Sequence, residues 1–390
     1  MNKGWQKQKL GEIADVQSGG TPLVSNKAFW EGELAWYSSG ELNDLYTSQP
    51  FRRISKLGLE SSNAKLFSKG SLLIGMYDTA ALKMSILDRD GAFNQAIAGV
   101  RPNSQLDLVF VLHAINAIKD ELLAQRRGVR QKNLSLDKIR GIEIGVPPLA
   151  EQQRIVGILD EAFDGLATAK ATAEKNLQNA RALFESHLQS VFSQRGKGWV
   201  EKSFADVCEI SSMLVDPRKK DYHDLLHVGG ANIASKTGEL IEMQTAREEG
   251  LISGKFVFDE TMILYSKIRP YLMKVARPDF QGLCSADIYP LSPKSGQIAR
   301  DYLFHLLLSP EFTDYANAGS ARAGMPKVNR DHLFAFSVFL PPVEKQKEYA
   351  AKLDALSTET QRLAAIYQQK LDALEALKKS LLHQAFSGEL

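Results

Sequence analysis

VPPLAEQQRIVGILD (146–160) and LPPVEKQKEYAAKLD (340–354) are two versions of one motif, placed 194 residues apart. Each has a proline pair, a glutamine four residues after the second proline, and a Leu-Asp pair in the apolar run that follows. Proline is not tolerated inside a helix, so each pair marks the point where a helix begins. A motif repeated over this distance indicates that the chain is a tandem duplication of one unit.

Other matched segments support the duplication. The spacing of 194 holds at both ends of the unit and shortens to 190 in its middle, where the two copies share a frame and differ in their loops. At 194 the matches are Gly4-Trp5 with Gly198-Trp199 and Phe192-Ser193 with Phe386-Ser387; at 190 they are 36–43 with 226–233 and 69–86 with 259–276.

A long helix is expected after each proline pair. No proline occurs between Pro148 and Pro217, and apolar or small residues recur at steps of three and four. This spacing is typical of a coiled-coil seam, and about 45 residues would give a rod of roughly 65 Å. The seam residues that we expect at the helix interface are Ile155, Leu159, Leu166, Leu177 and Phe184 in the first helix, and Tyr349, Leu353, Leu363, Leu371 and Leu374 in the second.

Two arrangements could bury this seam. Each stripe could pack on the core of its own globule, or the two helices could pair with each other. Two matching helices in one chain favour an antiparallel pair, which would bring both chain termini together and relate the globules by a pseudo-twofold axis.

The part of each unit before the prolines mixes short strands with helices, which predicts an α/β (α+β) globule. A helical pattern covers 106–125, and its counterpart covers 298–318. We therefore expect four parts: globules at 1–146 and 196–340, and helical spacers at 147–195 and 341–390.

Composition excludes several classes of protein. The chain has 390 residues, 24% charged and 44% hydrophobic, with a net charge of +2. It has no run of 18 apolar residues and no apolar segment near its start, so we expect neither a membrane span nor a secretory signal, and a cytoplasmic location. Cys208 and Cys284 form no CxxC and are expected as buried free thiols.

Motifs for catalysis are missing. Apolar residues precede both proline pairs, which differs from the Asn/Asp-Pro-Pro-aromatic motif of adenine methyltransferases. GLISGKF (250–256) has the wrong spacing for a phosphate-binding loop, and HDLLH (223–227) has aspartate where a zinc protease needs its glutamate. We expect no metal site, and we expect His113 and His305 to be core residues.

The pattern resembles the specificity subunit of type I DNA restriction–modification systems over essentially the whole chain. PPLAEQQRI (147–155) is the most specific match, and the stretches at 4–22 and 267–274 are also similar to the family's target-recognition domains. The second motif departs in having Lys345 where the first has Glu151. Gln152 and Gln346 are accordingly expected at the helix or partner interface.

The resemblance implies a non-catalytic, DNA-reading subunit. Each globule would read one half of a bipartite site in double-stranded DNA, and the helices would set the gap and dock two modification (methyltransferase) subunits. Restriction and translocase subunits would join them. It also implies that this chain holds no cofactor, with S-adenosylmethionine, ATP and Mg²⁺ needed only by the partner subunits. The alternative is a two-headed coiled-coil scaffold that does not read DNA.

DNA contacts were selected by residue type and by equivalent position in the two copies. Arginine and lysine reach phosphates or guanine, and asparagine and glutamine suit adenine, while small-residue loops would let DNA and backbone amides approach. Tyr77 and Tyr271 could support the DNA backbone or flank a distorted step, and the core is the position that we expect for them. The candidates are Ser18, Gly19, Gly20, Thr21, Ser38, Ser39, Arg126, Arg127, Arg130, Gln131 and Lys132 in the first unit, and Arg218, Lys219, Gly229, Gly230, Asn232, Lys267, Arg269, Lys274, Arg322, Lys327 and Arg330 in the second.

Overall fold

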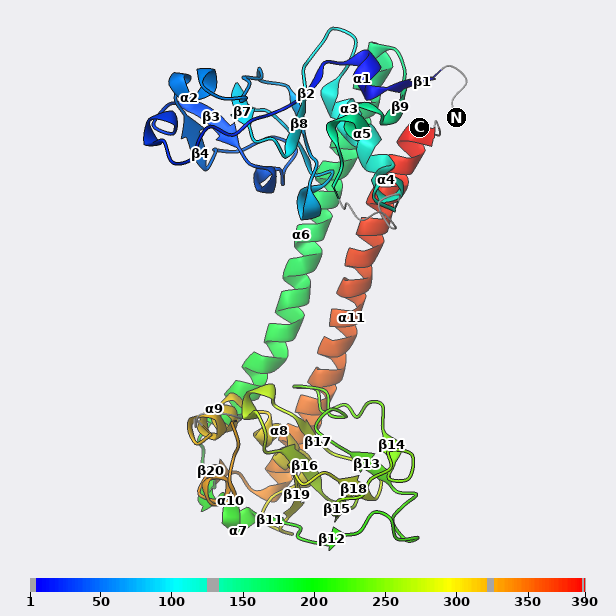
Figure 1. Cartoon of the computed structure of the whole chain (residues 1–390). Helices are drawn as coiled ribbons and strands as arrows, with labels where there is room; N and C mark the ends of the chain where they lie inside the picture. The colour runs from blue at the N-terminus through cyan, green and yellow to red at the C-terminus, as the bar shows by residue number, and fades with distance from the viewer. Residues whose placement is uncertain (1–4, 125–132, 321–325, 388, 390) are drawn as a thin grey trace. The chain divides into compact units, whose positions relative to one another are not determined.

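The computed structural model of the chain (Figure 1) describes residues 5–124, 133–320, 326–387 and 389. It divides into two compact units, 1–173 with 369–390 and 174–368. Each unit therefore holds one globule together with part of both long helices, since the division cuts through the middle of each helix.

The first globule contains two small sheets and a strand pair. One sheet is antiparallel, in the order β2 (Val16–Ser18), β8 (Ile97–Val100), β5 (Leu72–Gly75), β6 (Met84–Ile86). The other has the order β4 (Arg52–Ile54), β3 (Leu34–Tyr37), β7 (Gly91–Phe93), with β3 and β7 parallel. The pair is β1 (Gln6–Lys9) with β9 (Glu143–Val146).

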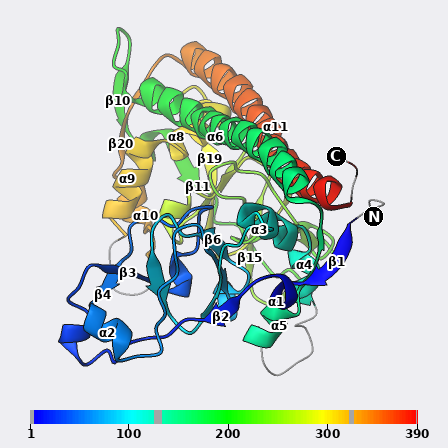
Figure 2. The same cartoon turned by 90° about the horizontal axis from the view of Figure 1, so that it is seen from above.

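The helices of the first globule lie in two places. Figure 2 shows α2 (Lys56–Glu60) beside β3 and β4, and α1 (Leu10–Ile13), α3 (Leu108–Ala117), α4 (Lys119–Ala124) and α5 (Leu136–Arg140) on the other side of β2. The single helix expected at 106–125 is wrong in one respect, because it is broken between α3 and α4. The amide of Ile118 donates a hydrogen bond to the carbonyl of Ile115 (3.3 Å), and α3 ends there.

The second globule repeats this plan. Its sheets have the orders β11 (Cys208–Ile210), β19 (Ile288–Pro293), β16 (Ile263–Ser266), β17 (Val275–Ala276) and β12 (Leu214–Val215), β15 (Lys255–Phe258), β18 (Gly282–Cys284), β13 (Leu226–Val228), β14 (Gln244–Thr245). β10 (Val200–Ser203) pairs with β20 (Ser337–Leu340), and β13 and β18 are parallel, as are β3 and β7. The matching pairings confirm the internal repeat.

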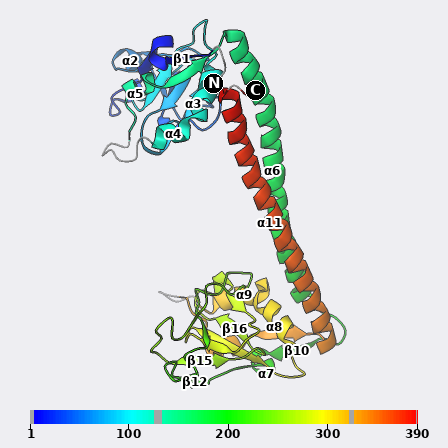
Figure 3. The ribbon, with the colours of Figure 1, turned by 90° about the vertical axis from the view of Figure 1, so that its right-hand side faces the viewer.

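The helices of the second globule are α7 (Phe204–Val207), α8 (Arg300–Leu307), α9 (Pro310–Ala318) and α10 (Arg330–Phe334). In Figure 3, α8 and α9 lie beside the long helices, and β12 and β15 lie farther from them. The helix expected at 298–318 is again two helices. Ser309 accepts a hydrogen bond from the amide of Phe312 (3.2 Å) and caps a new helix that begins with proline.

Two helices of 45 residues each, α6 (Leu149–Ser193) and α11 (Val343–Ser387), follow the proline pairs. Each begins in the core of its own globule and ends in the core of the other. In the first unit, Ile155 and Leu159 of α6 join Ala385 of α11 in one buried cluster. In the second unit, Leu353 of α11 and Phe192 of α6 belong to another.

Contacts between α6 and α11 within the first unit have antiparallel order. Lys170 pairs with Glu375 at 2.6 Å, and nearer the globule the Lys378 ammonium lies 5.0 Å from the centre of the Phe163 ring. Trp5 and Phe386, from near the two ends of the chain, are in edge contact with ring centres 6.4 Å apart.

The expected seam is covered at every position that we named. Ile155, Leu159, Leu177 and Leu353 are buried, and Leu166, Phe184, Tyr349, Leu363, Leu371 and Leu374 are half-buried. Both alternatives therefore contribute, because the first turns of each helix pack on their own globule and later turns contact the other helix.

Three smaller expectations also have an outcome. Cys208 and Cys284 are free and buried, and burial raises the pKa of each thiol to about 12. His113 and His305 are buried core residues. None of the helices in the described residues is long and apolar enough to span a membrane.

Candidate nucleic-acid interface

In the second globule, the turn after β16 lies against the segment that leads into α10. Ile268 and Lys327 form an isolated bridge, and the amide of Arg269 donates to the carbonyl of Pro326 at 2.8 Å. The amide of Val328 donates to the carbonyl of Lys267 at 2.9 Å. These bonds gather four predicted residues from two distant segments: Lys267, Arg269, Lys327 and Arg330. We call these four residues the basic cluster.

The neighbouring charges of the basic cluster lower the pKa of one of its members. Burial lowers the pKa of Lys267, and the positive charges of Lys327 and Arg330 lower it further, against a smaller opposing effect of Asp287. Arg269 is exposed and left-handed, at φ 51°. Cations that destabilise one another's charge form a favourable site for an anion such as a phosphate.

The first globule has the same junction. The amide of Leu134 donates to the carbonyl of Met76 at 2.8 Å, which matches the bond between Val328 and Lys267. The offset of 190 expected for this segment is wrong by one residue, because Leu72 pairs with Val100 as Ile263 pairs with Leu291, which aligns Met76 with Lys267. Asn133 is exposed on the segment that leads into α5. The predicted Arg126, Arg127, Arg130, Gln131 and Lys132 immediately precede it and lie outside the described residues, as does Arg322 in the second globule.

The expectation that Tyr77 and Tyr271 are core residues is wrong. Tyr77 follows Met76 and is 36% exposed, and Tyr271, in the equivalent turn, is 52% exposed. Both turns contain residues with positive φ, Leu82 at 55° and Met273 at 50°. A tight turn at a strand end projects its side chains outward, so each globule presents an aromatic ring near its junction.

The predicted loop at 18–21 lines a polar hollow of about 590 Å³ in the first globule. Its glycines, however, are packing positions. Gly19 and Gly20 are buried, and their amides already donate to the carbonyls of Ile97 (3.2 Å) and Phe93 (2.9 Å). These amides cannot also bind a phosphate. Ser18 and Thr21 remain on the wall of the hollow, together with three residues that the sequence pattern missed: Asn63, Lys65 and Gln95.

In the other predicted loops, many polar side chains form hydrogen bonds within the loop itself. Ser38 and Glu41 cap a short turn, with their side-chain oxygens 2.8 Å apart, and Ser39 follows, half-buried. Asn232 accepts from the amide of Gly229 (2.8 Å) and donates to the carbonyls of Ile241 and Glu242. Such bonds shape the loop and leave less capacity for reading bases.

Several predicted cations of the second globule are also engaged. Arg218 is paired with Asp216 at 2.8 Å, and the ammonium of Lys274 donates to the carbonyl of Gly230. Lys219 is exposed. In the basic cluster, the ammonium of Lys267 is also engaged, by the carbonyl of Ala286 and by Asp287 4.0 Å away. The other three members, Arg269, Lys327 and Arg330, are exposed and are therefore the stronger DNA candidates in this globule.

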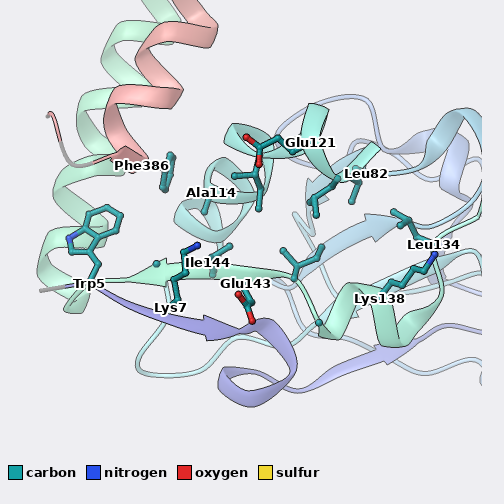
Figure 4. Close-up of a pocket in the computed structure, with 15 residues that line it drawn as sticks. Trp5, Lys7, Leu82, Ala114, Glu121, Leu134, Lys138, Glu143, Ile144 and Phe386 are labelled. Carbon is teal, nitrogen blue, oxygen red and sulfur yellow. The ribbon is translucent and has the colours of Figure 1, made fainter. Parts of the chain in front are cut away.

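A further hollow, of about 710 Å³, lies where the end of α11 meets the first globule (Figure 4). Trp5 and Phe386 stand at one end, and Leu134 and Lys138 at the other. In the second globule Phe336 holds the position that matches Ile142 of this hollow, and the ring centres of Phe312 and Tyr315 lie 5.2 and 4.9 Å from its own. We therefore attribute the hollow to the smaller side chain of Ile142 at the position that Phe336 fills in the second copy.

In the described residues, no group of three His, Cys, Asp or Glu side chains is placed to hold a metal ion. The two histidines of HDLLH lie beside different carboxylates. His223 lies 3.0 Å from Asp224, while His227 on β13 lies 2.9 Å from Glu249.

Comparison with known proteins places these features in a family. The chain matches the model of the type I restriction modification DNA specificity domain at residues 2–178 and again at 196–375. It is 26% identical to the type I restriction enzyme EcoDI specificity subunit of Escherichia coli, over 99% of this chain and 88% of the relative. It is 19% identical to the MjaVIII specificity subunit of Methanocaldococcus jannaschii, over 99% and 93%.

Solved structures share the fold. A chain from a study of complex assembly and conformational transition of the type I R-M system superposes with a TM-score of 0.79, 18% identity and coverage of 100% of this chain and 99% of that one. The HsdS subunit from Thermoanaerobacter tengcongensis gives a TM-score of 0.62, 17% identity and coverage of 100% and 98%.

Proposed function

The chain belongs to the family of type I restriction modification DNA specificity domains, and from that premise we propose that its two globules each read one half of a bipartite DNA site. DNA sequence specificity is the function that the family match and the full-length relatives support. In detail, we propose that each globule reads one half-site. The junctions at Met76–Leu134 and Lys267–Val328 would be the surfaces that contact DNA.

One observation carries this proposal. Both globules bring a strand-end turn against the segment before α5 or α10, through the same backbone bond. In the second globule this junction carries the basic cluster. Phosphate contacts from such side chains position a protein on the duplex, and neighbouring polar side chains then read base edges. Two copies of one frame with different side chains suit two different half-sites.

The chemistry is assigned to partner subunits. In this proposal two modification subunits dock on α6 and α11, use S-adenosylmethionine and methylate the DNA that the globules select, and restriction subunits join them with ATP and Mg²⁺. The chain itself contributes binding and spacing, and it works in the cytoplasm, where that DNA is. A scaffold without DNA reading would gain nothing from the four cations of the basic cluster, so this alternative is not favoured.

The test is methylation mapping in cells that express this chain with its modification subunits. We expect methyladenine in both halves of one interrupted motif. A chimera in which residues 17–145 come from another family member should change one half and keep the other. If no motif is found while the modification subunits are present and active, DNA reading is ruled out. If both halves change in the chimera, the globules are not independent readers.

A further inference from the structure

One surface of the first globule combines exposed apolar residues with cations. A hollow of about 660 Å³ lies beside β3 and β4, between residues 24–32 and 50–53. We call it the tip hollow; the residues on its wall that matter here are Val24, Lys27, Trp30, Phe51, Arg52 and Arg53. In Figures 1 and 2 its strand β4 lies close to α2, on the side of the first globule away from α3 and α5.

The wall of the tip hollow is apolar and open to solvent. Phe51 is 87% exposed and Val24 is 59% exposed, and the adjacent Leu23 is 66% exposed. Single exposed apolar residues are common, but a group of them around one hollow marks an interaction site. An exposed aromatic ring offers a flat face on which a base or sugar can stack.

Cations surround this apolar surface. The guanidinium of Arg52 lies 4.8 Å from the centre of the Trp30 ring. Arg53 donates to the carbonyl of Glu33 (3.1 Å) and to the side chain of Gln49 (3.3 Å). Within the part of the chain that the structure describes, no ion pair is found for Lys27, Arg52 or Arg53, and Glu31 is the one carboxylate on the wall.

The hollow has a rigid back. The indole N–H of Trp30 donates to the carbonyl of Leu23 (3.3 Å), and its ring meets that of Trp36 edge-on, with centres 5.0 Å apart. Trp36 is buried and donates to the carbonyl of Gly20 (3.0 Å), in the loop that lines the polar hollow. The two hollows are thus connected through a pair of fixed tryptophans.

The matching strands of the second globule carry different residues. Ala35 and Trp36 lie opposite Arg53 and Arg52 in the register of β3 and β4. With β7 aligned on β18, the matching pairs in β13 and β14 are Leu226 with Thr245 and His227 with Gln244. The Thr245 hydroxyl donates to Glu248 at 2.9 Å. The two arginines of one copy are therefore a glutamine and a capped threonine in the other.

We propose that the tip hollow is an additional DNA contact of the first globule, with Lys27, Arg52 and Arg53 on phosphates and Phe51 against a sugar or base. This rests on the proposed function and extends it, because the first globule then contacts the duplex at a second surface besides its junction. Arginine and aromatic residues are common in protein interfaces too, but DNA interfaces are much more positively charged. Three cations without an ion pair, against one carboxylate on the wall, fit the duplex better than a protein partner.

The experiment uses the chain in complex with its modification subunits and a labelled 40-bp duplex that carries the mapped methylation site. Binding is measured at several salt concentrations for Phe51→Ala and for the double variant Arg52→Gln/Arg53→Gln. Each phosphate contact contributes about 0.9 to the slope of log K against log salt. The double variant should therefore lose about 2 from the slope and bind ~10-fold or more weakly at moderate salt.

Phe51→Ala should bind about 5-fold more weakly with the slope unchanged, since stacking is independent of salt. Leu57→Ala, at a position that is 53% exposed on α2 outside the hollow, and Lys56→Gln, beside it, are matched controls and should bind as the unchanged chain does. All five positions are exposed, so the variants should fold.

Three results would overturn the inference. Unchanged affinity and slope in both variants, with site preference intact, would show that DNA does not touch the tip hollow. Loss of the modification subunits from the variant complex, seen by size-exclusion chromatography, would make it a protein interface. Equal losses in the Lys56 and Leu57 controls would show a general effect of charge or apolar area. Failure of the proposed function is separate, because the unchanged chain would then show no site preference.

Discussion

Gln152 and Gln346 make the same three hydrogen bonds in their two globules. The side-chain oxygen of Gln152 accepts from the amide of Asp107 (2.9 Å), and its nitrogen donates to the carbonyls of Gln105 (3.1 Å) and Pro147 (2.9 Å). Gln346 bonds the amide of Ala299 (2.8 Å) and the carbonyls of Gln297 (3.1 Å) and Pro341 (2.9 Å). Both side chains are buried. The repeated glutamine therefore fixes the start of each long helix to its own globule.

Replacing either glutamine should destabilise the globule that it holds. Gln152→Ala removes the partner of the buried Pro147 carbonyl and of two part-buried groups, the Asp107 amide and the Gln105 carbonyl, which should cost about 2–4 kcal/mol. Gln346→Ala should do the same in the second globule. Hydrogen exchange followed by mass spectrometry can report each globule separately. Gln153→Ala, at the next and exposed position, is the control and should be nearly neutral. Equal exchange in Gln152→Ala and Gln153→Ala would contradict the clamp.

The two long helices differ in their electrostatics about two turns after these glutamines. Asp354 lies 2.8 Å from the Nε2 atom of His305 and 2.6 Å from Arg277. Burial raises the pKa of this carboxyl, but the hydrogen bonds and charges of His305 and Arg277 outweigh it and lower the pKa to about 2. At the matching position, burial and the nearby Asp164 and Asp107 raise the pKa of Asp160.

Asparagine at these two positions should have opposite effects. Because the folded-state pKa of Asp354 is below its ordinary 3.8, its contribution is present above about pH 4 and is lost as the pH falls toward 2. Asp354→Asn should therefore cost about 2 kcal/mol at pH 7 and much less near pH 2. Asp160→Asn removes a charge that opposes folding at pH 7, so it should be neutral or slightly stabilising. Urea unfolding at both pH values, with one fluorescent label in each globule, would check this; equal losses at pH 7 would contradict the difference.

The end of each long helix should support the globule of the other repeat. Phe386 contacts Trp5 and Phe110, with ring centres 6.4 and 5.2 Å apart, and Phe192 lies 5.0 Å from Tyr302. Phe386→Ala should expose the first globule to protease and cost about 3 kcal/mol, while Phe192→Ala should affect the second. Leu377→Ala, at an exposed position on α11, is the control. If Phe386→Ala increased the protease sensitivity of the second globule instead, the end of α11 would not support the first globule.

Much of this architecture could be predicted from the sequence, because it depends on strong periodic signals. The proline pairs, the 194-residue repeat and the 3-4 spacing define the helices and the duplication. The break between α8 and α9 was missed although Ser309-Pro310 is a recognisable helix start, since the apolar spacing continues across it. The core position expected for Tyr77 and Tyr271 is wrong because both lie in turns that follow a buried strand, where side chains project outward.

The candidate contacts were harder to predict, because they depend on which loops meet. Nothing local to KIRP (267–270) indicates that Lys327 will lie beside it, since this follows from the bridge of Ile268 to Lys327. Glycine next to serine suggested an anion site at 18–21, yet the amides of Gly19 and Gly20 are used by β-strand neighbours. Asn63, Lys65 and Gln95 come from separate turns, so no sequence motif links them to this loop.

Neutralising the basic cluster should weaken DNA binding without selecting among sequences. Arg269, Lys327 and Arg330 are exposed, so their replacement by glutamine should leave folding intact. If each contacts one phosphate, the salt slope should fall by about 3. Arg218→Gln is the control, because this arginine is paired with Asp216. Binding of the assembled complex to specific and random duplexes at several salt concentrations is the measurement; an unchanged slope would remove these residues from the interface.

Lengthening both long helices should widen the gap between the two half-sites. Seven residues inserted after Ala173 and seven after Gln368 lie at the division between the units, and a full heptad keeps the apolar seam in register. The insertion adds about 10 Å of helix at 1.5 Å per residue, equivalent to about 3 base pairs at roughly 34 Å for 10 pairs. Methylation mapping should show the same two half-sites with a longer spacer. Inserting two residues in each helix is the control, since it rotates the following residues by about 200°, breaks the seam and should abolish methylation. An unchanged gap in the heptad variant would show that α6 and α11 do not set the spacing.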